Sequence, residues 1–121
     1  MLGHMALGDL EREVMTQLWD AGEPLTVRQV HERVGRDRDL AYTTVMTVLD
    51  RLVGKDVVVR ERDGRAFRYA PRLTRAAMTA ELMREALEVT GADRDQALIS
   101  FVGEASAEDL AALRRALADL A

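Results

Sequence analysis

Three threonines, Thr43, Thr44 and Thr47, share one face of a segment with helical periodicity, directly ahead of an arginine-rich stretch. Each threonine has a hydroxyl that can hydrogen-bond to base edges or phosphates, and a methyl that can contact the methyl of thymine. Short side chains also allow a helix to approach base edges closely in the major groove. A plain solvated face is the alternative for the threonines alone. Their place ahead of a basic hairpin favours recognition of DNA.

The arginine-rich stretch surrounds Asp63-Gly64, a dipeptide that predicts a two-residue hairpin turn. The arginines of this hairpin are Arg60, Arg62, Arg65 and Arg68. Guanidinium groups at a hairpin tip suit phosphates or an adjacent minor groove. Charges that protect an exposed strand edge are the alternative, and Glu61 and Asp63 partly neutralise the patch. Phe67 and Tyr69 alternate onto one face and are predicted to lie in the core, with a role as stacking platforms as the alternative.

The residues predicted to contact DNA belong to the helix face or to the hairpin. They are Tyr42, Thr43, Thr44, Met46, Thr47, Arg51, Arg62, Arg65 and Arg68. Tyr42 and Met46 flank the threonine face, and Arg51 lies where a backbone phosphate would be expected. The helix and the hairpin together predict a DNA-binding regulator.

Three helices must position these residues, and apolar periodicity predicts them over about residues 9–20, 27–34 and 41–53. Thr26 and Gln29 have the spacing of a capping box at the start of the second helix. Strand character follows at about residues 57–59 and 67–69. The third helix has an inward stripe formed by Val45, Val48, Leu49 and Leu52. This order of elements predicts a winged helix-turn-helix.

Helical periodicity returns over about residues 74–90, 93–102 and 106–121. Three short helices bury little core by themselves, so a second copy of the chain is the expected source of contacts. The residues predicted to form this dimer interface are Met78, Leu82, Leu98, Phe101, Leu110, Leu113 and Leu117. Alternatively, these residues pack only between the helices of their own protomer.

The predicted fold class is mainly α with a small β-hairpin wing. An N-terminal winged helix-turn-helix domain is expected over residues 6–73, and a C-terminal three-helix dimerisation region over residues 74–121.

The net charge of −4 is unevenly distributed along the 121 residues. Residues 26–75 contain 12 Lys and Arg against 7 Asp and Glu, a net charge of +5. The residues before and after this segment carry −4 and −5. A basic middle between acidic ends is expected if one surface faces phosphates.

Enzyme chemistry finds no support in the sequence, and no catalytic residue, metal site or cofactor is predicted. Cysteine is absent, and no phosphate-binding or dinucleotide-binding glycine motif occurs. His4 lies in the opening MLGHM, which is interpreted as a partial cloning remnant, and His31 is expected to form a surface pair with Glu32. The sequence shows no signal peptide and no membrane-spanning run, so a cytoplasmic protein is predicted.

The segments Leu10–Met15, Leu18-Trp19 and Val27–Val30 resemble the opening of the penicillinase-repressor (BlaI/MecI type) family. Ala41–Leu52, AYTTVMTVLDRL, resembles that family's recognition helix, and Arg68–Pro71 resembles the end of its wing. The resemblance covers roughly residues 7–121 and is strongest over residues 40–71. The alanine- and arginine-rich composition suggests an actinobacterial member.

The resemblance implies a homodimer on a palindromic, double-stranded operator that blocks transcription of β-lactamase or other resistance genes. It also implies that a membrane-bound sensor protease inactivates the repressor by cleavage, here near Ser100-Phe101. This chain has serine where the staphylococcal pattern has asparagine, and it lacks the cysteine motif of a copper-responsive branch. Two alternatives are a winged-helix regulator controlled by a directly bound small molecule, and a winged-helix protein-interaction module.

Overall fold

The computed structural model describes residues 7–35 and 38–121. The opening MLGHM with His4 lies outside the described residues, as do Arg36 and Asp37 of the connector between the second and third helices. Contacts divide the chain into two compact units between Met83 and Arg84. This division falls further along the chain than the domain boundary that the sequence suggested.

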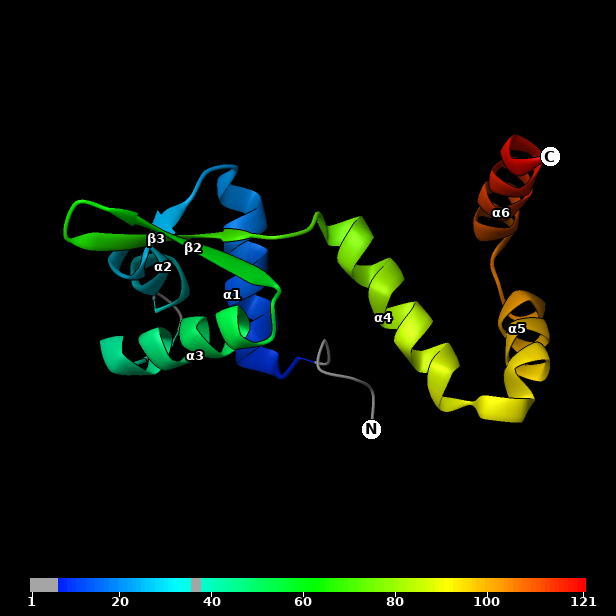
Figure 1. The fold of residues 1–121 in the computed structure, drawn as a ribbon, viewed down its shortest axis with the longest axis horizontal. Helices are drawn as coiled ribbons and strands as arrows, with labels where there is room; N and C mark the ends of the chain where they lie inside the picture. The colour runs from blue at the N-terminus through cyan, green and yellow to red at the C-terminus, as the bar shows by residue number, and fades with distance from the viewer. Residues whose placement is uncertain (1–6, 36–37) are drawn as a thin grey trace. The chain divides into compact units, whose positions relative to one another are not determined.

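The first unit combines helices with a small antiparallel sheet (Figure 1). Its elements are α1 (Asp9–Ala21), β1 (Leu25–Thr26), α2 (Val27–Val34), α3 (Tyr42–Gly54), β2 (Val58–Asp63), β3 (Ala66–Pro71) and the start of α4 (Arg75–Val89). The strands lie in the order β1-β3-β2, with Leu25 opposite Tyr69 and Arg62 opposite Phe67. The two-residue β1 was not predicted, because so short a strand shows no period in the sequence.

The core of the first unit lies between α1, α2, α3 and one face of the sheet. The predicted inward stripe of α3 is confirmed, because all four of its residues are buried. The other buried apolar residues are Val14, Met15, Leu18, Leu25, Val30, Val34, Val57, Val58, Tyr69 and Met78. Each α-helix therefore turns its apolar stripe inward and leaves its polar face to solvent.

The capping box at the start of α2 is confirmed in the structure. The backbone N–H of Gln29 donates to the Thr26 hydroxyl at 3.2 Å, and the backbone N–H of Thr26 donates to the Gln29 side-chain oxygen at 2.9 Å. These bonds satisfy backbone donors that a helix start leaves unpaired.

A Schellman motif ends α3 and directs the chain into the wing. Asp56 has a positive φ of 63°, and its N–H donates to the Val53 carbonyl at 3.0 Å. The Val57 N–H donates to the Leu52 carbonyl at 3.1 Å. These two bonds satisfy carbonyls at the helix end. The reversal places Val57 and Val58 in the core at the start of β2.

The hairpin turn consists of Gly64 and Arg65, since Asp63 still pairs with Ala66. The predicted turn at Asp63-Gly64 is thus wrong by one residue. Gly64 has φ 64°, and a type II′ turn requires such a positive φ at its first central position, where glycine is favoured. Arg65 consequently occupies the tip of the wing.

An ion pair joins α1 to the end of α3. The Lys55 ammonium lies 2.8 Å from the Glu11 carboxylate, and both side chains are largely buried. Burial raises the pKa of the Glu11 carboxyl, but bonds from Lys55 and Gly8 and the charges of Lys55 and Arg51 outweigh it. The pKa of Glu11 is therefore lowered. This pair holds the C-terminal end of α3 against α1.

The segment after the wing is held to α1 by Trp19. The indole Nε1–H donates to the Leu73 carbonyl at 2.9 Å, and the Arg75 guanidinium lies 5.1 Å from the centre of the indole ring. Arg75 also reaches Asp20 at 3.3 Å. The start of α4 therefore belongs to the first unit.

The second unit contains the end of α4, a short 3₁₀ helix η1 (Gly91–Asp93), α5 (Arg94–Gly103) and α6 (Ala107–Leu120). Ser106 caps α6 by accepting the Asp109 N–H at 3.1 Å. No side chain of residues 84–121, all of which the structure describes, is buried. The apolar residues of this unit are thus only partly covered by their own chain.

We expect Glu11→Gln to lower the free energy of unfolding by about 1–2 kcal/mol near neutral pH, because Lys55 loses this carboxylate. The folded-state pKa of Glu11 is lowered, so its contribution is complete above the ordinary carboxyl pKa. The contribution is lost as the pH falls through the lowered value. Urea unfolding over an acid pH series should therefore show a weaker acid dependence in Glu11→Gln.

Glu32→Gln is the matched control for this experiment. Glu32 pairs with Arg28 at 3.4 Å, and both side chains are mostly exposed. Its loss should change the free energy of unfolding by less than about 0.5 kcal/mol. Equal effects of the two substitutions would contradict a special role for the Glu11–Lys55 pair.

Candidate nucleic-acid interface

The exposed face of α3 presents the helix residues that the sequence singled out. Tyr42, Thr43, Thr44, Met46, Thr47 and Arg51 are all exposed. Burial of the opposite stripe causes this arrangement, because it fixes the rotation of α3 about its axis. The helix therefore offers solvent a row of short polar side chains with a tyrosine and a methionine beside them.

Thr47 has a defined hydrogen-bonding role within this face. Its hydroxyl donates to the Thr43 carbonyl of the same helix at 3.0 Å. The hydroxyl hydrogen is thereby used, and the oxygen remains an acceptor. Acceptors match the amino groups of adenine and cytosine in the major groove.

His31 holds the start of α3 in place. Its Nε2 lies 2.7 Å from the Leu40 carbonyl and must carry the hydrogen, since a carbonyl oxygen only accepts. Its ring also packs edge-to-face with the Tyr42 ring, with centroids 5.9 Å apart. The predicted surface pair between His31 and Glu32 is wrong. Glu32 lies beside Arg28, one turn earlier on α2.

Two arginines and an aromatic ring occupy one face of the wing. The guanidinium carbons of Arg60 and Arg62 lie 4.5 and 5.6 Å from the centre of the Phe67 ring. Arg60 also reaches Asp50 of α3 at 3.7 Å, so this face borders the exposed face of α3. In Figure 1, α3 and the tip of the β2–β3 hairpin lie on the same side of α1. Arg60 was absent from the predicted contact set.

The prediction that Phe67 lies in the core is wrong, whereas Tyr69 is buried as expected. Phe67 is 38% exposed and Tyr69 only 4%. Both residues face the same side of β3, but Phe67 lies toward the hairpin tip. Phe67 packs instead against the cationic groups of Arg60 and Arg62, an arrangement that ring electrostatics favour.

The opposite face of the wing carries Arg68, which lies 2.6 Å from Asp63. Its cross-strand partner in the sheet is Glu61. Arg68 thus lies among carboxylates, away from the face of Arg62. Arg65 is exposed at the tip, and Arg62 donates to the Gly64 carbonyl at 3.3 Å. The structure therefore brings Arg60 and Arg62 to the α3 side of the hairpin and leaves Arg68 on the other side.

The residues predicted for the dimer interface fall into two groups. Met78 is buried in the core of the first unit, and Leu82 packs against that core. On α5 and α6, Leu98, Phe101 and Leu117 are exposed, and Leu110 and Leu113 are half-buried. Ser100 and Phe101, the residues of the expected cleavage site, lie within α5 and are exposed.

Within residues 7–35 and 38–121, no three His, Asp or Glu side chains gather into a group that could hold a metal ion. None of the helices described is long and apolar enough to cross a membrane.

A family model described as the penicillinase repressor matches residues 7–119 of this chain. The transcriptional regulator BlaI of Mycobacterium tuberculosis, in strains CDC 1551 and H37Rv, is 56% identical over 117 residues. The match covers 94% of this chain and 84% of that protein. Both matches identify regulators of transcription and not enzymes, as the sequence predicted. The relative comes from an actinobacterium, which supports the predicted source.

Two solved structures are similar to the first part of the chain. The solution structure of the DNA-binding domain of the repressor BlaI is 25% identical, with a TM-score of 0.55. The match covers 63% of this chain and 92% of the solved chain. The solution structure of monomeric Bacillus licheniformis BlaI in complex with the blaP half-operator is 25% identical, with a TM-score of 0.51. The match covers 59% of this chain and 85% of the solved chain. These similarities confirm the predicted fold class.

Proposed function

Because this chain belongs to the penicillinase repressor family, we propose that it is a DNA-binding transcriptional repressor. The observation that carries the proposal is the exposed threonine face of α3 beside the Arg60–Arg62 face of the wing. Both lie in residues 26–75, which have a net charge of +5 in a chain of net charge −4. The similar B. licheniformis protein is bound to a half-operator, which supports the same use of this surface here.

The two elements would divide the work of recognition. α3 enters the major groove, where the Thr43–Thr47 face contacts base edges and Arg51 binds a backbone phosphate. Arg60, Arg62 and Arg65 of the wing bind phosphates or the adjacent minor groove. Arg68 contributes less, because Asp63 already neutralises it. The sequence specificity therefore comes from α3, and most of the affinity from the arginines.

The active form is proposed to be a homodimer on a palindromic operator. The exposed apolar residues of the second unit support this assembly. They are Val89, Leu98, Ile99, Phe101, Val102, Leu117 and Leu120. A two-fold axis would place two recognition helices in major grooves about 34–36 Å apart. The proposed interface lies on α5 and α6, because Met78 already packs in the core of its own protomer.

The regulated genes are proposed to encode a β-lactamase or another resistance function, and the site of action is the bacterial cytoplasm. Cleavage by a membrane-bound sensor protease at Ser100–Phe101 would sever α5 within the proposed interface. Because this bond lies inside a helix, α5 must unwind locally before a protease can bind it in an extended form. Cleavage there would separate apolar residues that the dimer needs together.

The direct test measures the affinity of the full chain for a dyad-symmetric sequence from its own promoter region, over a salt series. Affinity should exceed that for random duplex by about 10³-fold or more, and it should fall steeply as salt rises. Equal and weak affinity for every dyad of that region and for random duplex would contradict the proposal. Salt-insensitive binding would favour a protein-interaction module instead.

Substitutions on α3 separate base contacts from phosphate contacts. Arg51→Ala should weaken binding to all duplexes and reduce the salt dependence by about one phosphate contact. Thr47→Ala should also relax the preference at one operator position, with a cost of about 1–3 kcal/mol against the preferred base. A panel of operator variants measures both effects. Equal losses on operator and random DNA in both variants would remove Thr47 from base recognition.

Leu117→Asp should lower the dimer fraction, because it places a carboxylate on the apolar face of α6, which also contains Leu110 and Leu113. Sedimentation velocity over a concentration series measures the shift. Arg115→Asp is the matched control, since it introduces the same group on the opposite side of α6 and should leave the dimer intact. An unchanged dimer in Leu117→Asp would exclude Leu117 from the interface.

A further inference from the structure

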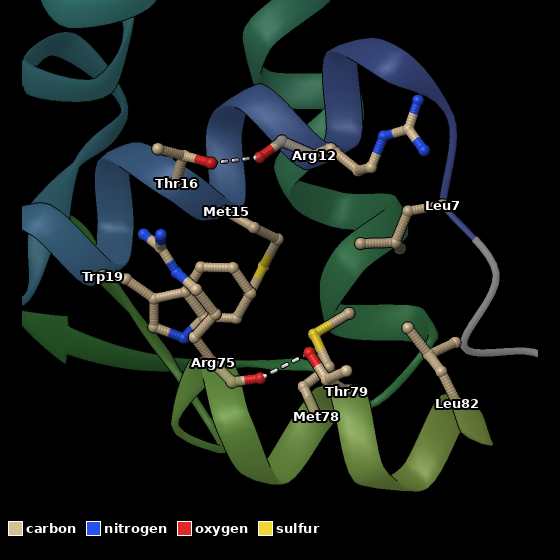
Figure 2. A pocket seen from close by; sticks show the side chains of 9 residues that line it. All are labelled: Leu7, Arg12, Met15, Thr16, Trp19, Arg75, Met78, Thr79 and Leu82. Carbon is tan, nitrogen blue, oxygen red and sulfur yellow. Dashed lines mark hydrogen bonds between the residues drawn. The ribbon is translucent and has the colours of Figure 1, made fainter. Parts of the chain in front are cut away.

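A cavity of about 390 Å³ lies in the first unit between α1 and the first turns of α4 (Figure 2). Its lining residues come from both helices and from the residues just before α1. They are Leu7, Arg12, Met15, Thr16, Trp19, Arg75, Met78, Thr79 and Leu82. This volume falls in the range of small-molecule sites in proteins. The cavity is separate from the exposed face of α3 and from the wing.

The walls of the cavity are mainly apolar and aromatic. Met15 and Met78 are buried residues of the core, and in Figure 2 their sulfur atoms lie between the two helices. Trp19 forms one end, and Leu7 and Leu82 lie toward the other. Thioethers adapt to the shape of a ligand and make favourable contacts with aromatic rings. The walls therefore suit a flat, apolar group.

The polar atoms of the lining are unequally available to a ligand. The hydroxyls of Thr16 and Thr79 donate to carbonyls of their own helices at 3.0 and 2.9 Å. The Trp19 Nε1–H is used by the Leu73 carbonyl. The guanidinium groups of Arg12 and Arg75 therefore supply the donors that a ligand can use.

The charge at the cavity is positive, because its lining contains two arginines and no carboxylate. The carboxylates that pair with these arginines, Asp9 and Asp20, lie outside the lining and are well exposed. Exposed ion pairs are weak, so an anion in the cavity can compete for the guanidinium groups. Arg75 is best placed, since it already stacks over the Trp19 ring at 5.1 Å.

We propose that this cavity binds a small amphipathic anion, an aromatic carboxylate. Its ring lies against Met15, Met78 and Trp19, and its carboxylate accepts hydrogen bonds from Arg75 at the Trp19 end of the cavity. A charge-assisted, bidentate pair of this kind favours arginine over other donors. Binding of such an anion does not depend on DNA binding.

The first experiment titrates the full chain with 1-naphthylacetate and with its neutral counterpart 1-naphthylacetamide. Calorimetry should give a Kd below about 1 mM for the acid, a modest value for about 14 non-hydrogen atoms. The amide should bind at least about tenfold more weakly. In ¹³C-methyl methionine spectra the acid should shift the signals of Met15 and Met78. Met46 on α3 and Met83 near the end of the first unit should not move.

Two variants and a control localise the site. Arg75→Met should weaken binding of the acid by about tenfold or more and leave the amide within about twofold. Arg84→Met, on an exposed position of the same helix outside the lining, should leave both affinities unchanged. Thr79→Phe should fill the cavity and abolish binding of both probes. The methionine methyl spectrum of the free variant shows whether it is folded.

Equal affinities for acid and amide, or no effect of Arg75→Met, would overturn the proposal. Shifts confined to Met46 or Met83 would do the same, since they place the probe elsewhere. If the Met15 and Met78 signals move when the protein alone is diluted, a second copy of the chain fills the cavity and the proposal is wrong. A Kd above about 1 mM for the acid would also contradict the proposal.

Discussion

Burial of one apolar stripe on α3 controls the arrangement of the first unit. Val45, Val48, Leu49 and Leu52 are all within the core, and the helix cannot rotate about its axis without exposing them. Successive residues of a helix are about 100° apart, so a rotation by one position would bury a charged side chain, Arg51 in one direction and Asp50 in the other. The same burial therefore stabilises the first unit and fixes which side chains of α3 face solvent.

The contacts around α3 extend this constraint to both of its ends. His31 bonds the carbonyl of Leu40 ahead of the helix, and Lys55 pairs with Glu11 behind it. The Schellman motif at Asp56 then sets the direction of β2, and Arg60 reaches back to Asp50. Recognition helix and wing are thus parts of one packed unit. A substitution that loosens either end would change the position of both surfaces together.

The two units use their apolar residues differently. In the first unit the apolar stripes meet in one core, and Phe67, which is partly exposed outside it, packs against arginines. In residues 84–121 the apolar side chains of α5 and α6 stay largely accessible. Exposed apolar area of this kind is costly in water, and association with a second copy would remove the cost. The apolar residues of the first unit are therefore covered mainly within one protomer, whereas those of α5 and α6 are left available for the proposed assembly.

The sequence by itself determined the helices, the hairpin, the α2 cap and the outward face of α3. These features depend on periodicity and on bonds between residues a few positions apart, so they are visible in the order of residues. Tertiary structure alone decided the partner of His31, the exposure of Phe67 between Arg60 and Arg62, and the burial of Met78. It also decided the pairing of β1 and the cavity between α1 and α4. These features join residues far apart in the chain or at the edge of the core, and their energies depend on how whole elements pack. Local sequence patterns therefore do not predict that packing.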